Sequence, residues 1–175
     1  MKKQWVFAAA LMAFSASSMA VDGYKNLKFG MSEADALATK TCNFKKRPSG
    51  EKGVDQFVCG NFKVGGKSTN SAVMLFIGGK LIRFGFEQPV DDIEPILQAM
   101  RDKYGAAINP PTRSQIEALE RVPNDSVDIN FDNNTVTLRL ITDERLNQSM
   151  LVMYSVKDFD QQWNDLKNSQ LSSDL

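Results

Sequence analysis

The most informative absence in this sequence is histidine. None of the 175 residues is a histidine, which excludes Ser-His-Asp and Cys-His catalytic arrangements, histidine-ligated zinc, and the commonest general base at neutral pH. Cysteine is almost as scarce, since Cys42 and Cys59 are the only two. An enzyme built from this sequence would therefore depend on a pair of carboxylates, as glycosidases do, or on an acidic metal cluster.

The chain also lacks a charge of one sign. Without Lys2 and Lys3, 19 of the 21 basic side chains remain against 21 acidic ones, and the only basic run spans residues 45–47. This balance argues against nucleic acid or an anionic membrane surface as the partner. A phosphate-binding loop is missing too, because Gly65-Gly66-Lys67-Ser68 lacks the P-loop spacing and is interpreted as a hairpin turn. We expect no cofactor.

Long apolar runs are absent except near the N-terminus. Residues 1–20 combine Lys2 and Lys3, an apolar run over residues 5–14, and small residues Ser18 and Ala20 before a cleavage point, which is the pattern of a secretory signal peptide. A membrane anchor is the disfavoured alternative, because a spanning helix needs about 20 apolar residues. We therefore expect cleavage after Ala20 and a soluble periplasmic chain that does not insert into the membrane.

The two cysteines are expected to form a disulfide. Export would place Cys42 and Cys59 in an oxidising compartment, where an even pair of cysteines normally bonds. The loop that they close would contribute about 3 kcal/mol of stability in the chain-entropy model. A redox or nucleophilic thiol is the alternative, but the sequence has no CxxC motif and no histidine base.

A β-hairpin over residues 71–87 is the centre of the predicted fold. Gly78-Gly79 suits a tight primed turn, and after it Ile82, Phe84 and Phe86 alternate with Leu81, Arg83 and Gly85. The pattern predicts that the first set faces the core. Before the turn both alternating sets are apolar, which indicates a central strand covered on both sides.

The rest of the chain repeats one pattern, a helix followed by three strands, and ends in a further helix. We expect an α+β domain over residues 21–168, with possible halves 21–88 and 89–168, an antiparallel sheet with helices packed on one face, and a flexible tail over 169–175. The expected helices cover residues 33–39, 92–104 and a short segment after Thr112, and the last begins at Asp158. The other expected strands are 55–64 with a bulge at Gly60, 127–131, 135–141 and 150–156.

The segment Phe29-Gly30-Met31-Ser32-Glu33-Ala34, followed by a helix and a strand meander, resembles small exported bacterial proteins of beta-lactamase inhibitor protein-like architecture. The small outer-membrane assembly lipoproteins are similar in the same stretch. The resemblance implies a scaffold that binds proteins through an open sheet face and hairpin turns. The chain departs from these families in having no lipobox cysteine and only one possible disulfide.

The candidate partner-binding residues are Lys80 at the hairpin turn and Arg83 on its less apolar face, although Arg83 could also be a solvated sheet residue. Two acidic groups could supply a carboxylate pair, but they fall where caps and turns favour acidic residues, so we assign no catalytic and no metal-binding residues. These groups are Asp91, Asp92 and Glu94, and Asp125, Asp128 and Asp132.

Taken together, these features predict a non-enzymatic periplasmic protein that binds another protein of the cell envelope, as an inhibitor or an assembly factor. The alternatives are a periplasmic hydrolase that uses two carboxylates and a carrier of a small apolar ligand. The sequence leaves the oligomeric state open.

Overall fold

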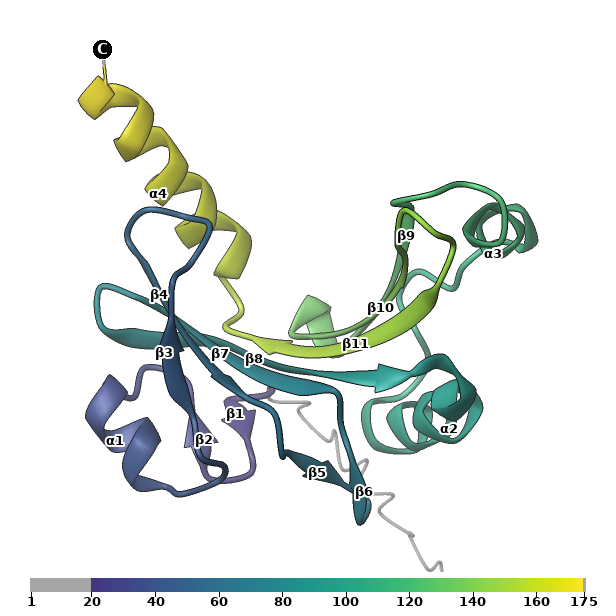
Figure 1. The fold of residues 1–175 in the computed structure, drawn as a ribbon, viewed down its shortest axis with the longest axis horizontal. Coiled ribbons are helices and arrows are strands. Elements are labelled where there is room, and N and C mark those ends of the chain that lie inside the picture. The colour runs from purple at the N-terminus through teal and green to yellow at the C-terminus, as the bar shows by residue number, and fades with distance from the viewer. Residues whose placement is uncertain (1–19, 175) are drawn as a thin grey trace, which may run out of the picture.

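The computed structural model describes residues 20–174, so the predicted signal peptide lies outside the described range except for Ala20. A seven-stranded antiparallel sheet runs through the molecule in the order β3-β4-β7-β8-β11-β10-β9 (Figure 1). Its strands are β3 (Lys45–Arg47), β4 (Val54–Cys59), β7 (Ser71–Ile77), β8 (Lys80–Pro89), β9 (Ser126–Phe131), β10 (Val136–Thr142) and β11 (Gln148–Ser155).

Two small ribbons and several helices complete the fold. The ribbons pair β1 (Gly23–Tyr24) with β2 (Leu27–Lys28) and β5 (Lys63–Val64) with β6 (Lys67–Ser68). The helices are α1 (Glu33–Ala38), α2 (Ile93–Tyr104), α3 (Arg113–Leu119) and α4 (Phe159–Asp174), with short 3-10 turns η1 (Val90–Asp92) and η2 (Asp132–Asn134). This combination confirms the predicted α+β class.

The predicted hairpin is present as β7 and β8. Gly78 and Gly79 have φ of 56° and 70°, the left-handed values that a type I′ turn requires. A bulge shifts the register so that Phe76 pairs with Leu81. Leu81 therefore joins the main core with Phe84 and Phe86, whereas Ile82 is buried outside that cluster. The alternation predicted for residues 81 and 82 was wrong because Ile82 is the extra residue of the bulge, which changes the face on which Leu81 lies.

The two halves of the chain form one continuous sheet. The meander β4-β7-β8 and the meander β9-β10-β11 meet where β8 pairs with β11 over Arg83 to Pro89. The first half carries the additional edge strand β3. Each half thus contributes a meander of three strands after a helix, as predicted.

The strand predicted over residues 55–64 is a second correction. β4 ends at Cys59, Gly60 is exposed, and the chain leaves the sheet to form the separate β5-β6 ribbon. Phe62 explains the departure, because its ring is buried against Phe84 and Phe86, with centroids 5.3 and 5.7 Å away. In a continuous bulged strand, Phe62 would be a residue of the sheet, and its ring would not lie over the rings of Phe84 and Phe86.

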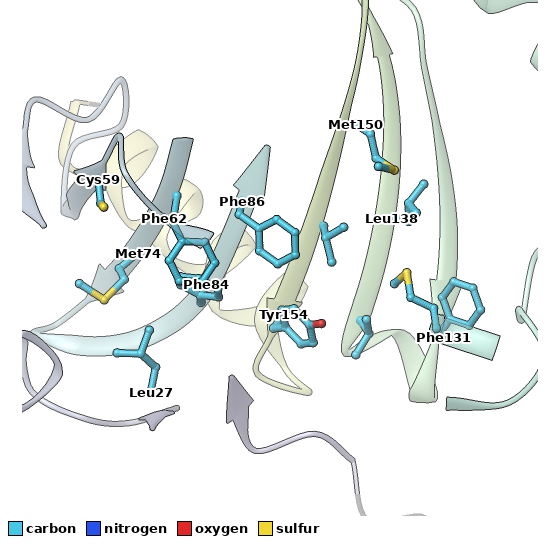
Figure 2. Close-up of a cluster of buried hydrophobic side chains, with 14 of the residues drawn as sticks. Leu27, Cys59, Phe62, Met74, Phe84, Phe86, Phe131, Leu138, Met150 and Tyr154 are labelled. Atoms are coloured by element: carbon cyan, nitrogen blue, oxygen red, sulfur yellow. The ribbon is translucent and has the colours of Figure 1, made fainter. Parts of the chain in front are cut away.

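The main core covers one face of the sheet and is rich in aromatic rings (Figure 2). Tyr24 from the β1-β2 ribbon stacks on Phe84 at 4.7 Å and lies 4.9 Å from Tyr154. Burial of each such ring contributes about 1.5–3 kcal/mol. The ribbons β1-β2 and β5-β6 and the helices α1 and α2 lie on this side of the sheet (Figure 1).

The terminal helix α4 lies on the opposite face, so the prediction that all helices pack on one face was wrong (Figure 1). Phe159, at its start, covers the guanidinium of Arg83, whose neighbour Phe84 points into the main core. The core face is already covered by the ribbons and α2, so the apolar side of α4 is buried on the open side instead.

The helix α4 also extends further than expected. It continues through Asp174, so residues 169–174, predicted as a flexible tail, are helical. Lys167 forms an ion pair with Glu51, and Gln170 Nε2 donates to the carbonyl oxygen of Lys52 at 2.5 Å. These contacts with the loop before β4 support the end of the helix.

The N-terminal end of the described chain is attached to the second half of the sheet. The backbone nitrogen of Val21 donates to Asp132 Oδ2 at 2.6 Å, across 111 positions of sequence. The same carboxylate accepts a hydrogen bond from Thr135 Oγ1 at 2.7 Å.

Candidate functional site

Arg83 is half-buried and is held on the α4 face of the sheet. Its Nε donates to Ser155 Oγ on β11 at 2.8 Å, and its Cζ lies 3.3 Å from the centroid of the Phe159 ring. Burial lowers the pKa of Arg83 to about 10, with a further contribution from the positive charge of Arg139. The guanidinium is still charged at neutral pH, so the fold retains a cation in a partly desolvated position.

A polar pocket of about 290 Å³ surrounds this guanidinium. Four strands of the sheet, η2 and the first turn of α4 supply its walls, so residues from both halves meet there. The main polar wall residues are Arg83, Asp128, Asn130, Thr137, Arg139 and Asp160. Figure 1 shows that the sheet curves so that β9, β10 and β11 rise on the same side as α4, which makes this face concave.

Two of the other charged side chains in the pocket wall are paired with each other. Asp128 and Arg139 are direct cross-strand partners and form a two-point ion pair, with Nε–Oδ1 at 2.6 Å and Nη2–Oδ2 at 2.7 Å. Hydrogen bonding to Asp128 raises the pKa of Arg139. The next pair along the strands, Thr137 and Asn130, is joined by a 2.8 Å hydrogen bond.

Arg83 differs from Arg139 in having no direct carboxylate partner. Within residues 20–174, no acidic side chain lies within 4 Å of its guanidinium, although Asp160 and Asp128 are near enough to favour its charged form. The pocket therefore presents a cation fixed in orientation by Phe159 and Ser155, beside a row of hydrogen-bonding side chains. Such an arrangement suits a planar anionic group, above all a carboxylate.

The second predicted binding residue, Lys80, is not part of this pocket. It is exposed at the hairpin turn, and its backbone forms an isolated antiparallel β-bridge with Ser32, next to α1. The structure thus separates the two residues that the sequence placed on one surface. Sequence reasoning missed Arg139 and Phe159. The sequence did contain one indication of this polar cluster. The turn at 132–134 brings the polar positions 128 and 130 opposite positions 139 and 137.

The predicted disulfide between Cys42 and Cys59 is present. It joins the loop after α1 to the last residue of β4, and Cys59 is buried in the main core. The bridge belongs to the main core, on the face of the sheet opposite the Arg83 pocket, and β7 separates β4 from β8. Its position indicates a structural role.

The acidic groups considered for catalysis have separate contacts. Asp92 occupies the N-cap position of α2 but makes no capping bond, and its carboxylate pairs with Lys67 at 2.5 Å. Asp125 accepts a hydrogen bond from the backbone nitrogen of Ser126. Over residues 20–174, no three acidic or cysteine side chains are grouped so that they could hold a metal ion. No helix of the described chain is both long and apolar enough to span a bilayer.

Comparison with known proteins gives relatives with matching length. A protein of Haemophilus influenzae is 31% identical over 151 residues, covering 86% of this chain and 84% of the relative. A Pasteurella multocida protein is 29% identical over 171 residues, covering 87% of each chain. Both carry the description "Uncharacterized protein". No solved structure gave a significant match. A family model described as "Uncharacterised protein" matches residues 24–174, and the chain belongs to that family.

Proposed function

We propose that the protein is an exported, non-enzymatic binding module that holds an acidic segment of another cell-envelope protein on its concave sheet face. The observation that carries the proposal is the half-buried Arg83 guanidinium, which has no carboxylate within ion-pairing distance in the described chain. Removing an arginine from water costs free energy unless a counter-charge compensates it. A carboxylate from a partner would provide that compensation.

The surroundings of Arg83 favour binding over catalysis. Phe159 holds the guanidinium from one side and Ser155 takes its Nε hydrogen bond, which leaves the two terminal nitrogens for a two-point contact with a carboxylate. Of the two carboxylates that line the pocket, Asp128 is already paired with Arg139, and Asp160 is near enough to Arg83 to favour its charged form. The pocket therefore offers mainly groups that suit recognition of a ligand.

The remainder of the concave face suits an extended segment. Beside the pocket, Leu75 and Leu151 are only partly buried, and Thr137 and Asn130 continue the polar row toward the sheet edge. A chain that places one carboxylate at Arg83 would contact both kinds of side chain. The signal-like residues 1–20 and the Cys42–Cys59 bridge support export to an oxidising compartment as part of the proposal.

The test is capture from a periplasmic extract by the immobilised mature chain under mild conditions. We expect a stoichiometric partner that is retained by the native chain and by Arg113→Met, an arginine whose side chain is 93% exposed on α3. Arg83→Met should abolish retention and Arg83→Lys should weaken it, because lysine keeps the charge without the planar fork. Cross-linking and mass spectrometry would locate the contact.

Two outcomes would overturn the proposal. One is the absence of a stoichiometric partner for the native chain. The other is a partner whose retention is the same for Arg83→Met and the native chain, provided that both have the same circular dichroism spectrum. Inhibition or assembly would be distinguished by whether the captured partner loses activity when bound.

A further inference from the structure

On the other face of the sheet, a second pocket of about 290 Å³ lies between α2, the β5-β6 ribbon and the sheet. Its walls are mainly apolar and aromatic, including Tyr24, Phe86, Ile96, Met100, Val152 and Tyr154. The rings of Phe86 and Tyr154 come from neighbouring strands and are labelled in Figure 2. This volume is at the lower end of the ~300–1,000 Å³ range of small-molecule sites, so it suits one or two fused rings.

One polar atom in this pocket has no partner. The side chain of Gln88 on β8 is 2% exposed and lines the pocket, and no donor of the described chain lies within hydrogen-bond distance of its Oε1. Over the described residues it is the one buried side-chain oxygen or nitrogen left in this condition. Buried carbonyl oxygens in native proteins are nearly always paired, so this acceptor points to a donor supplied by a ligand.

The charges near the pocket indicate a neutral ligand. Lys67 and Asp92 pair with each other at the pocket wall. Burial raises the pKa of Tyr24 to about 12 and also raises that of Tyr154, so both hydroxyls are uncharged at neutral pH. The remaining charged lining residue, Lys103, is exposed, and its Nζ lies 5.1 Å from the centroid of the Tyr104 ring.

We infer that this pocket binds a small, neutral, mainly aromatic molecule that donates one N–H or O–H to Gln88 Oε1. Ring faces would pack on Tyr24, Phe86 and Tyr154, where offset or edge-to-face contacts are favourable. The site is independent of the Arg83 pocket, because Phe86 and Gln88 point to the opposite face of β8 from Arg83. The inference therefore does not depend on the proposed function.

Indole and 1-methylindole form a matched pair of probes, since methylation removes the donor and adds one methyl group. Titration of the full mature chain, followed by calorimetry and by NMR shifts of α2 residues, should show saturable binding of indole. We expect indole to bind about 2- to 10-fold more tightly than 1-methylindole, the range expected for one neutral hydrogen bond. Gln88→Leu should remove that difference while the chain stays folded.

A second variant tests whether indole binds in this pocket and not at another place on the protein. Ala99 is exposed on α2 at the pocket wall, so Ala99→Phe should fill the opening without disturbing the core and should abolish indole binding. The inference is overturned if the native chain shows no saturable binding, if the two probes bind equally, or if Ala99→Phe leaves binding unchanged. A crystal of the indole-soaked protein in which water alone contacts Gln88 Oε1 would also overturn it.

Discussion

At the residue scale, the partial burial of the charged Arg83 side chain lowers the stability of the fold. Its guanidinium is partly desolvated, is stacked on Phe159, and lacks a carboxylate within ion-pairing distance in the described chain. Residues placed for binding often reduce stability in this way, because their favourable partner arrives only with the ligand. Stability and binding should therefore respond in opposite directions when Arg83 is replaced.

We predict that Arg83→Met leaves the free energy of unfolding unchanged or raises it by about 1 kcal/mol at neutral pH. The measurement is urea unfolding of the variant beside the native chain and Arg113→Met. A loss of more than about 1 kcal/mol would instead assign Arg83 a structural role through its stacking and its bond to Ser155.

The pH dependence of this effect has a defined sign. The pKa of Arg83 in the folded chain, about 10, lies below its value in the unfolded chain because of burial, so above pH 10 the unfolded chain binds more protons and stability rises with pH. The gain in unfolding free energy from Arg83→Met should therefore shrink as pH increases above 10. Paired thermal melts of native and variant chains at pH 8, 9, 10 and 11 would measure it, because other titrations cancel in the difference.

At the element scale, the attachment of α4 depends on a close approach at Gly53. Gly53 has φ of 76°, and a Cβ added there would lie 2.9 Å from Leu166 Cδ1. Gly53→Ala should therefore lower the free energy of unfolding by about 1–2 kcal/mol. Gly50→Ala is the matched control, since an added Cβ would meet nothing within 4 Å and its φ is not positive.

Urea unfolding followed by Trp163 fluorescence would report this change, because Trp163 lies on α4 one turn before Leu166. Equal effects of Gly53→Ala and Gly50→Ala would show that α4 does not depend on contact with this loop.

Elements whose signals are local could be predicted from the sequence. The Ser32 cap of α1, the Thr112–Gln115 capping box of α3 and the Gly78-Gly79 turn each depend on residues within four positions of one another, and all are present. The bulge that places Leu81 in the core and the side on which α4 packs depend on partners distant in sequence. For the same reason, the isolation of Arg83 and Gln88 from counter-charges and donors could not be predicted from composition or alternation.

At the scale of the whole molecule, the pairing of β8 with β11 makes the two halves one folding unit. Seven register pairs cross this boundary, from Arg83–Ser155 to Pro89–Ser149, and the Arg83 pocket takes residues from both sides of it. We expect residues 21–88 and 89–168 to unfold in a single transition, with equal calorimetric and van't Hoff enthalpies. Two separate heat-capacity peaks would contradict this.

The disulfide stabilises the same unit through its loop. Replacing both Cys42 and Cys59 by serine should lower the free energy of unfolding by about 3 kcal/mol in the chain-entropy model, with further loss because Cys59 is buried. Unfolding of the native chain with and without a reducing agent separates the two contributions. An unchanged denaturation midpoint after complete reduction would be the opposing result.

The contact between Val21 and Asp132 lies directly after the predicted cleavage point. If the leader is removed after Ala20, the Val21 nitrogen becomes a terminal ammonium, and its 2.6 Å bond to the Asp132 carboxylate gains a charge. The ammonium adds a Coulomb attraction to a bond that already has one charged partner, so Asp132→Asn should destabilise the trimmed protein more than one that retains Ala20. Cleavage at the predicted point would then strengthen the contact that holds the first residue of the trimmed chain against the distant end of the sheet.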